Sequence, residues 1–267
     1  MSDVSSSGAR INYTVEGPED RPVLLFINSI GTTRDLWLSQ VPVLGDTYRL
    51  IRYDARGHGS SSVPPGDYSI AQLGHDALAI LDAEGARQAH ICGISLGGLT
   101  AMWLGVNMPD RVSSLILANT AARIGSVQSW TDRIALVHER GMGEVAELAI
   151  PRWFTPGFRQ RHEEIAAQFK TMVAACPTAG YLGCCAALRD EDLREAIANI
   201  RCPVLVVAGS TDEATPLEGM RFIHERIAGS TMLTLDAAHL SNVEQSDAFT
   251  SAVMEFLGNL AARKFKG

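Results

Sequence analysis

Short runs of apolar residues recur along the chain, and each is followed by a loop rich in Gly, Asp or Ser. The apolar positions are continuous rather than alternating, which is typical of strands that are covered on both faces of a sheet. Helical patterns separate the runs, and this alternation of strand and helix predicts a mostly parallel sheet in an α/β architecture. We expect strands at residues 22–28, 48–54, 89–94, 112–119, 203–209 and 231–236.

One helix is predicted together with both of its ends, at residues 69–84. Its apolar positions lie three or four residues apart, at Ile70, Leu73, Ala77 and Leu81. Ser69 and Gln72 have the spacing of a capping box, in which each side chain bonds the backbone N–H of the other residue. Gly85 follows the helix and can adopt the left-handed conformation that ends many helices.

The strand pattern stops over residues 122–195, where amphipathic helical stretches replace it. We expect breaks between these stretches where Gly and Pro gather, at residues 140–143, 155–157 and 176–180. Because the strand pattern then returns, we predict an α/β core of residues 1–121 and 196–267, interrupted by a helical cap at 122–195.

The composition is that of a globular protein and argues against several classes of function. Of the 267 residues, 46% are hydrophobic and 20% are charged, which suits one α/β domain rather than a disordered or fibrous chain. The net charge of −7 has no basic cluster to offset it, which argues against a nucleic-acid partner. No apolar run approaches the length of a membrane span, and residues 1–10 lack the layout of a signal peptide, so we expect a cytoplasmic protein without a membrane partner.

Five cysteines are present, an odd number without the C-x-x-C or Cys/His spacing of redox and metal sites. We expect that they pack as small apolar side chains, with redox or metal roles as the less favoured alternative. They are Cys92, Cys176, Cys184, Cys185 and Cys202.

A serine at the end of the strand predicted at 89–94 is the first residue that could carry chemistry. Gly93, Ser95 and Gly97 form the pattern G-x-S-x-G, and a helical pattern follows directly. This is the context of a nucleophile elbow, since a serine in a strained turn leaves no room for side chains two residues away. A plain tight turn is the alternative. At the start of the helix, the N–H of Leu96 would be available to an anion.

A serine hydroxyl needs a base, and His239 is the best placed of the seven histidines. It follows the last predicted strand, in a loop at the carboxyl edge of the sheet where Ser95 also lies. Five other histidines fall inside predicted helices or a strand, at His75, His90, His138, His162 and His224.

An acid must orient that imidazole, and we expect Asp212 to do so. Asp212 ends another strand at the same edge and gives the order Ser, Asp, His along the chain. The neighbouring Glu213 and a merely solvated loop are the alternatives. Asn119 occupies the other strand end at which an acid could lie, which favours Asp212.

Asp54, Arg56 and His58 follow the strand predicted at 48–54, in a segment that contains two glycines. We interpret this segment as a tight structural turn in which Asp54 and Arg56 satisfy backbone groups, and we assign His58 no catalytic role.

With these motifs in hand, the chain resembles the α/β-hydrolase superfamily over its whole length. Among its members it is most similar to the bacterial 3-oxoadipate enol-lactonases, in the segments FINSIGTTRDLW, YDARGHGSS, GISLGG, LANTAARIG, RWFTPGF and AHLSNVEQ. The resemblance implies a mostly parallel sheet of about eight strands flanked by helices, with a helical cap inserted after the sixth strand. It also implies Ser95 as nucleophile, His239 as general base and acid and Asp212 as its orienter, without a metal or organic cofactor.

The implied activity is the opening of a small anionic enol-lactone to 3-oxoadipate. A carboxylesterase or perhydrolase that acts on neutral esters is the alternative within enzymes, and a ligand-binding receptor is the alternative outside them. The resemblance leaves a homo-oligomer open.

In many α/β-hydrolases the strand that corresponds to the segment FINSIGTTRDLW ends in a His-Gly pair. The loop after this pair supplies a backbone N–H to the oxyanion. Here Asn28 and Ser29 replace that pair, so we expect the N–H of Ile30 opposite that of Leu96, with the N–H of Ser29 as the alternative. A plain turn around Gly31 that only ends the strand is the other alternative.

The carboxylate of such a substrate needs a cation in a protein of net charge −7. Arg133 is our candidate, because Trp130, Arg133 and Ile134 share one helical face in the predicted cap. A solvated Arg133 is the alternative. Arg123 and Trp153 are weaker candidates for substrate binding.

Overall fold

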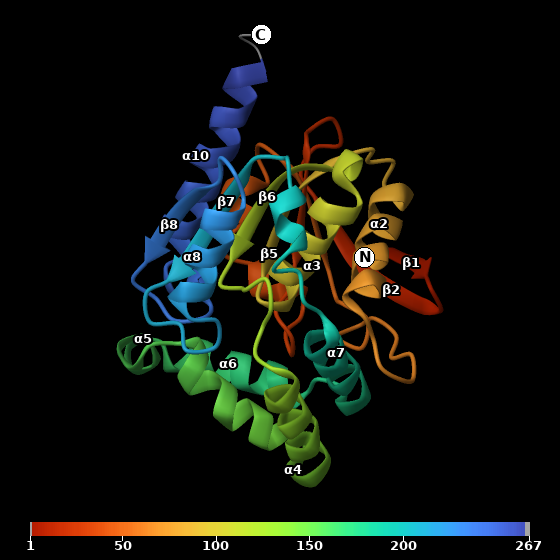
Figure 1. Ribbon diagram of the computed structural model, residues 1–267, viewed down its shortest axis with the longest axis vertical. Helices are drawn as coiled ribbons and strands as arrows, with labels where there is room; N and C mark the ends of the chain where they lie inside the picture. The colour runs from red at the N-terminus through yellow and green to blue at the C-terminus, as the bar shows by residue number, and fades with distance from the viewer. Residues whose placement is uncertain (1, 265–267) are drawn as a thin grey trace.

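The computed structural model describes residues 2–264, which form one eight-stranded sheet with helices around it (Figure 1). The strands have the order β1-β2-β4-β3-β5-β6-β7-β8; the β1–β2 and β2–β4 pairs are antiparallel and the other neighbouring pairs are parallel. This confirms the predicted mostly parallel sheet. The strands are β1 (Ser2–Ser6), β2 (Ala9–Glu16), β3 (Val23–Ile27), β4 (Arg49–Tyr53), β5 (Ala89–Ile94), β6 (Val112–Ala118), β7 (Val204–Gly209) and β8 (Thr231–Leu235).

The central strands are apolar without interruption because both of their faces are covered. All residues of β3 and β7 are buried, and Leu25 in β3 lies opposite both Ile51 in β4 and Ile91 in β5. The expectation of two covered faces is wrong for β8, which forms an edge of the sheet and is mostly exposed or half-buried. Its position at the edge, and not its own sequence, leaves it open to solvent.

The N-terminal hairpin of β1 and β2 was not located by the apolar runs. β1 is short and polar, and β2 alternates in the manner of a strand with one covered face. Ser7 and Gly8 connect the two strands with φ angles of 43° and 78°, as in a tight hairpin turn. The Ser-Gly pair is the signal in the sequence that would have marked this hairpin.

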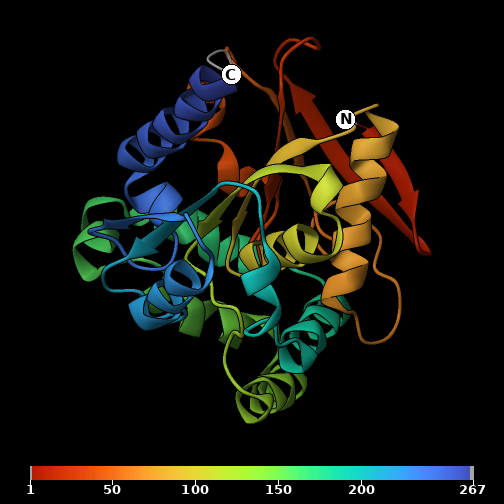
Figure 2. The same cartoon turned by 45° about the horizontal axis from the view of Figure 1, so that its top comes forward.

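Helices cover both faces of the sheet (Figure 2). α3 contacts α2, β5 and β6, whereas α10 contacts α1, α9 and β7. The capping box predicted for α2 is present, and Gly85 follows with a φ of 65°. The core helices are α1 (Val41–Leu44), α2 (Ile70–Ala83), α3 (Leu96–Asn107), α8 (Leu217–Arg226), α9 (Ser241–Glu244) and α10 (Ser246–Lys264), with short 3-10 turns at Arg34–Trp37, Pro109–Arg111 and Ala196–Asn199.

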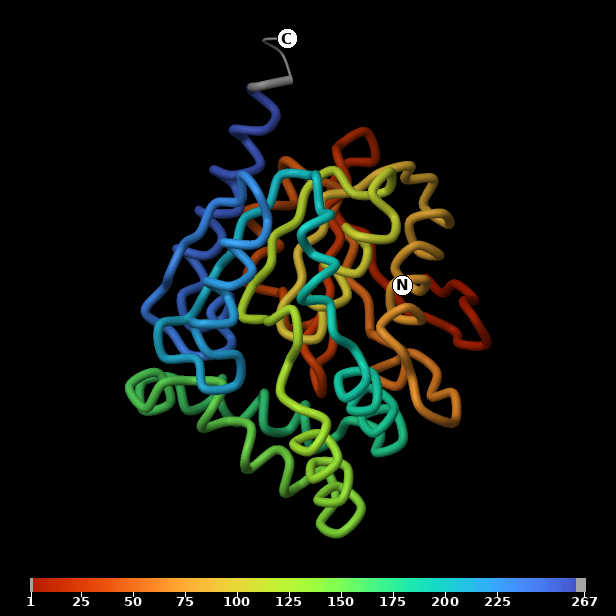
Figure 3. Tube along the Cα trace, viewed as in Figure 1, coloured from red at the N-terminus to blue at the C-terminus, as the bar shows by residue number. Residues whose placement is uncertain are grey.

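Four helices lie between β6 and β7 and gather beyond one end of the sheet, drawn in green to teal in Figures 1 and 3. They are α4 (Val127–Trp153), α5 (Pro156–Arg161), α6 (Glu163–Ala174) and α7 (Thr178–Asp190). Gly141 has a φ of 73° and kinks α4 within the expected break at 140–143. The other two expected breaks coincide with the starts of α5 and α7, while the break at His162 between α5 and α6 was not predicted.

The cysteines have the packing role expected of them. Cys92, Cys176, Cys184 and Cys185 are buried, and all five thiols are free. Burial raises the pKa of Cys185 to about 12, so this thiol is un-ionised at neutral pH.

Among residues 2–264, no single helix is both long enough and apolar enough to cross a membrane. Within this described part of the chain, one bent pair, α6 and α7, reaches such a length and composition together, and the two helices meet at an angle of 91°.

The ion pair between Arg56, after β4, and Asp76, in α2, is completely buried. The guanidinium donates two hydrogen bonds to the carboxylate, at 2.7 and 2.6 Å, and both side chains are at most 1% exposed. Burial opposes the charge of Arg56, but the hydrogen bonds and the charge of Asp76 raise the pKa of the guanidinium above its ordinary value. Each charge therefore depends on the other.

We predict that Asp76→Ala lowers the free energy of unfolding by about 3–5 kcal/mol, because the Arg56 charge is left buried and unpaired. Asp82→Ala in the same helix is the matched control, since Asp82 pairs with Arg111 while its own side chain is 65% exposed. The control should change stability by less than about 1 kcal/mol. Urea unfolding of both variants measures the difference, and equal losses would contradict the assignment.

Candidate active site

Ser95 lies between β5 and α3 with a φ of 57° and a ψ of −119°, a backbone conformation that L-residues rarely adopt. The flanking glycines are required sterically. A Cβ atom on Gly93 would lie 2.2 Å from the carbonyl oxygen of Gly97, and one on Gly97 would lie 2.1 Å from that of Ile27. The segment therefore has the geometry of a nucleophile elbow, as expected from the G-x-S-x-G pattern.

The structure brings Asp212 and His239 together at the carboxyl edge of the sheet. The distance from Asp212 Oδ2 to His239 Nδ1 is 2.9 Å, and both residues are buried. Burial opposes the negative charge of Asp212, but His239 and hydrogen bonds from Thr215 and Asn119 lower the pKa of the carboxyl to about 2. The ionised carboxylate accepts the Nδ1 proton, which leaves His239 Nε2 as an acceptor.

Asn119 follows β6, the other strand end at which an acid could have been. Its side chain supports the Asp212–His239 pair. Its Nδ2 donates to Asp212 Oδ2 at 3.0 Å and to the carbonyl of Ala238 at 3.1 Å. The asparagine thus joins the loop after β7 to the loop that carries His239.

Residues 28–33 form a tightly bonded loop after β3, opposite the start of α3. Asn28 donates to the carbonyl of Tyr53 at 2.7 Å, and the N–H of Gly31 donates to His58 Nε2 at 2.9 Å. The N–H of Thr32 closes a turn onto the carbonyl of Ser29 at 3.2 Å. Since Gly31 and Thr32 already donate within the protein, the N–H groups of Ile30 and Ser29 stay the candidates for the oxyanion site.

A cavity of about 160 Å³ lies between the core and the cap and brings most of the predicted site residues together. It is lined by two arginines and by no acidic side chain. Among residues 2–264, no group of three His, Cys, Asp or Glu side chains could hold a metal ion. The cavity residues are Ser29, Ile30, Ser95, Ile124, Gly125, Ser129, Trp130, Arg133, Ala149, Arg152, Trp153, Tyr181, Ala214, Thr215 and His239.

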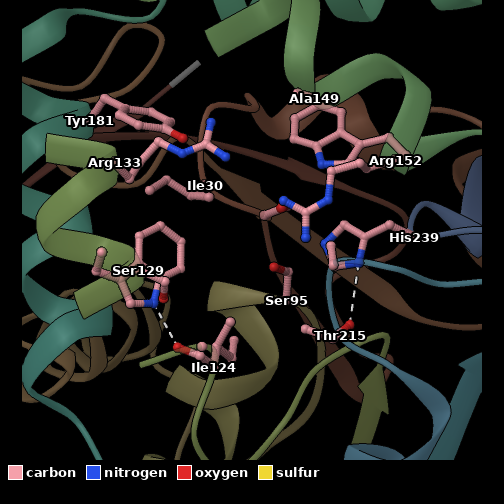
Figure 4. A pocket seen from close by; sticks show the side chains of 15 residues that line it. Ile30, Ser95, Ile124, Ser129, Arg133, Ala149, Arg152, Tyr181, Thr215 and His239 are labelled. Atoms are coloured by element: carbon pink, nitrogen blue, oxygen red, sulfur yellow. Dashed lines mark hydrogen bonds between the residues drawn. The ribbon is translucent and has the colours of Figure 1, made fainter. Parts of the chain in front are cut away.

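The two arginines reach the cavity from opposite ends of α4 (Figure 4). Arg133 lies beside Tyr181, while the guanidinium of Arg152 lies near His239 and Ser95. Arg152 also donates to the carbonyl of Glu213 at 2.9 Å. Arg152 was not predicted from the sequence, although it directly precedes Trp153; the kinked, 27-residue α4 brings it back to the site.

The other predicted binding residues are divided between the cavity and its surroundings. Trp130 and Trp153 line the cavity, and the Trp153 ring lies 6.5 Å from that of His239. Arg123 does not line it; it pairs with Asp192 at 3.0 Å beside a neighbouring groove. Ile134 packs against the core but is not one of the residues that line the cavity.

The turn at residues 54–60 supports the loop after β3. Asp54 accepts the N–H of Arg34 at 2.8 Å and that of Ser60 at 2.9 Å, as the prediction of a structural turn required. Arg56 instead donates its two shortest hydrogen bonds to the carboxylate of Asp76. His58, for which no specific contact was predicted, accepts the N–H of Gly31 and so fixes the loop beside Ser95.

Comparison with known proteins agrees with this fold. Residues 22–246 match the model of the alpha/beta hydrolase fold family, and the chain belongs to that family. Two 3-oxoadipate enol-lactonases of Acinetobacter baylyi are 44% and 37% identical to it, over 94% and 95% of both chains respectively. The crystal structure of the enol-lactonase from Burkholderia xenovorans superposes with a TM-score of 0.94 at 36% identity, covering 96% of this chain and all of that one.

The bond between Gly31 and His58 generates a prediction for the dependence of stability on pH. Burial lowers the pKa of His58 below its ordinary value of 6.5, against the opposing effects of the Arg56 carbonyl and Asp54. Below about pH 6.5 the unfolded chain therefore binds a proton that the folded protein does not, and stability falls as the pH falls. The contribution of neutral His58 to the stability of the folded protein is fully present above that pH.

We expect His58→Gln to remove this part of the pH dependence, because the amide oxygen can accept the Gly31 N–H without titrating. Urea unfolding of the wild type and the variant between pH 5 and 8 measures it. The free energy of unfolding of the wild type should fall more steeply below pH 6.5, by up to about 1.4 kcal/mol per pH unit. Parallel curves would show that His58 does not titrate in this way.

Proposed function

We propose that the protein hydrolyses 3-oxoadipate enol-lactone to 3-oxoadipate, through an acyl-enzyme at Ser95. The observation that carries this proposal is a cavity next to Ser95 that contains two arginines and no acidic side chain. Guanidinium groups in a partly dehydrated cavity favour an anionic ligand. The names of the relatives at 44% and 37% identity point to the same substrate, a small lactone with an acetate side chain.

In the first half of the reaction, Ser95 Oγ attacks the lactone carbonyl while His239 Nε2 accepts its proton. Asp212, held ionised by its hydrogen bonds, stabilises the imidazolium that forms. The N–H groups of Ile30 and Leu96 bind the oxygen that becomes negative. The bond to the ring oxygen then breaks, the enolate oxygen takes the proton from the His239 imidazolium, and the resulting enol becomes the ketone.

In the second half, His239 takes a proton from water, and the resulting hydroxide attacks the acyl carbonyl. The bond to Ser95 Oγ breaks, and the serine recovers its proton from His239. The product leaves with two carboxylates, one of which was present in the substrate. No step requires a redox group or a second substrate besides water.

The catalytic residues and the arginines come from different parts of the chain. Ser95, Asp212 and His239 belong to the predicted core of residues 1–121 and 196–267, whereas both arginines belong to the cap proposed at 122–195. We assign the substrate carboxylate to Arg133, with Trp130 as an apolar wall beside it. Arg152, nearer to Ser95, would then meet the carboxylate that the reaction creates. A cytoplasmic location stays a prediction from the sequence.

The first test compares the turnover of the enol-lactone with that of p-nitrophenyl acetate. Consumption of the lactone is followed by the loss of its ultraviolet absorbance. We expect kcat/KM for the lactone to be well above that for the neutral ester, because only the lactone engages the arginines. Ser95→Ala should abolish turnover of both. A better rate with the neutral ester would favour a carboxylesterase, and substrate binding without any turnover would favour a receptor.

The role of Arg133 is tested by Arg133→Gln, which keeps the length and polarity of the side chain but removes its charge. Loss of a charge-assisted hydrogen bond costs about 1.5–3 kcal/mol, so kcat/KM for the lactone should fall about 10- to 100-fold. Hydrolysis of the neutral ester should change much less. Arg123→Gln, outside the cavity, is the matched control and should leave both rates near those of the wild type. A comparable loss in the control would reject this assignment.

A further inference from the structure

The hydroxyl group of Ser29 is buried without a hydrogen-bond partner. Ser29 is only 2% exposed, and its Oγ is one of four buried side-chain polar atoms that have no partner within residues 2–264. The other three belong to Arg49, Arg159 and Asn242, none of which lines the cavity. Because folded proteins seldom leave such groups unpaired, an isolated hydroxyl in a residue that lines the cavity indicates a partner that arrives with the ligand.

The position of Ser29 restricts what that partner can be. Ser29 lines the same cavity as Ser95 and His239 and directly precedes Ile30, whose N–H is the proposed oxyanion donor. Four covalent bonds separate Ser29 Oγ from the nitrogen of Ile30, so the two atoms lie within about 5 Å of each other. An oxygen atom bound by the Ile30 N–H is therefore within reach of this hydroxyl when the side chain takes the matching rotamer.

The surrounding loop holds the backbone of Ser29 in place before any substrate binds. The carbonyl of Ser29 accepts the N–H of Thr32 at 3.2 Å and its hydroxyl at 2.8 Å. On either side, Asn28 is bonded to Tyr53 and Gly31 to His58. With its backbone fixed, the hydroxyl needs only a rotation about the Cα–Cβ bond to reach a developing charge, and a small reorganisation is the condition for effective oxyanion stabilisation.

We propose that the Ser29 hydroxyl is a third donor of the oxyanion hole. It donates a hydrogen bond to the lactone carbonyl oxygen as that oxygen becomes negative, and its proton stays on Ser29. The hydroxyl has no partner in the free enzyme and gains one in the transition state, so its hydrogen bond accelerates the chemical step rather than strengthening substrate binding. This inference rests on the proposed acyl-enzyme reaction at Ser95.

The test is Ser29→Ala, compared with Ser114→Ala. Ser114 is another fully buried serine, in β6 outside the cavity, and its hydroxyl is paired with His90 Nδ1 at 2.7 Å. We expect Ser29→Ala to lower kcat about 10- to 100-fold for both the lactone and p-nitrophenyl acetate, as for loss of one hydrogen bond to a charged group, with little change in KM. Its Tm should be unchanged or higher, because the variant loses an unpaired buried hydroxyl. Ser114→Ala should show the reverse, a lower Tm and an unchanged kcat.

Binding of a small alkylboronic acid gives a second measurement, since its adduct with Ser95 is tetrahedral and anionic. Ser29→Ala should raise the inhibition constant by the same factor as it lowers kcat. An unchanged kcat, or a rise in KM confined to the anionic lactone, would overturn the proposal; the second result would place the hydroxyl on the substrate carboxylate. If Ser95→Ala retains turnover, the acyl-enzyme reaction itself fails, and the oxyanion role of Ser29 fails with it.

Discussion

The strained backbone of Ser95 is the constraint around which the site is built. A residue in such a conformation costs about 1–3 kcal/mol and persists only where its surroundings enforce it. Here the Ser95 N–H donates to the carbonyls of Ala118 and Asn119, both at 3.1 Å, and its own carbonyl accepts the Thr120 hydroxyl at 2.7 Å. The end of β6 therefore holds the elbow from one side, and the close approach of β3 to Gly97 holds it from the other.

The same strand ends carry the rest of the chemistry, because parallel strands present their carboxyl ends at one edge. Asn119 both receives the Ser95 N–H and donates to Asp212, so the elbow and the Asp212–His239 pair share a support. On the other side, the loop after β3 is fixed by His58. These contacts hold the backbone before substrate arrives, which is how a site stabilises developing charge without reorganising.

The charge of the cavity is opposite to that of the whole molecule. The chain has a net charge of −7, yet its cavity is lined by Arg133 and Arg152 and by no acid. Net charge governs solubility and long-range encounter, whereas recognition depends on groups within a few ångströms in a partly dehydrated space. The strand ends thus set the geometry around Ser95, and α4 sets the local charge.

The sequence by itself determined the features whose causes act over a few residues. The G-x-S-x-G turn, the capping box of α2 and the kink near Gly141 follow from local sterics and local hydrogen bonds, so short motifs predict them. Only the tertiary structure decided that Arg152 shares the cavity while Arg123 pairs with Asp192 outside it, and that His58 bonds an amide 27 residues away. Such contacts join separate elements, and their formation depends on how the kinked α4 and the loops pack, which no short stretch of sequence specifies.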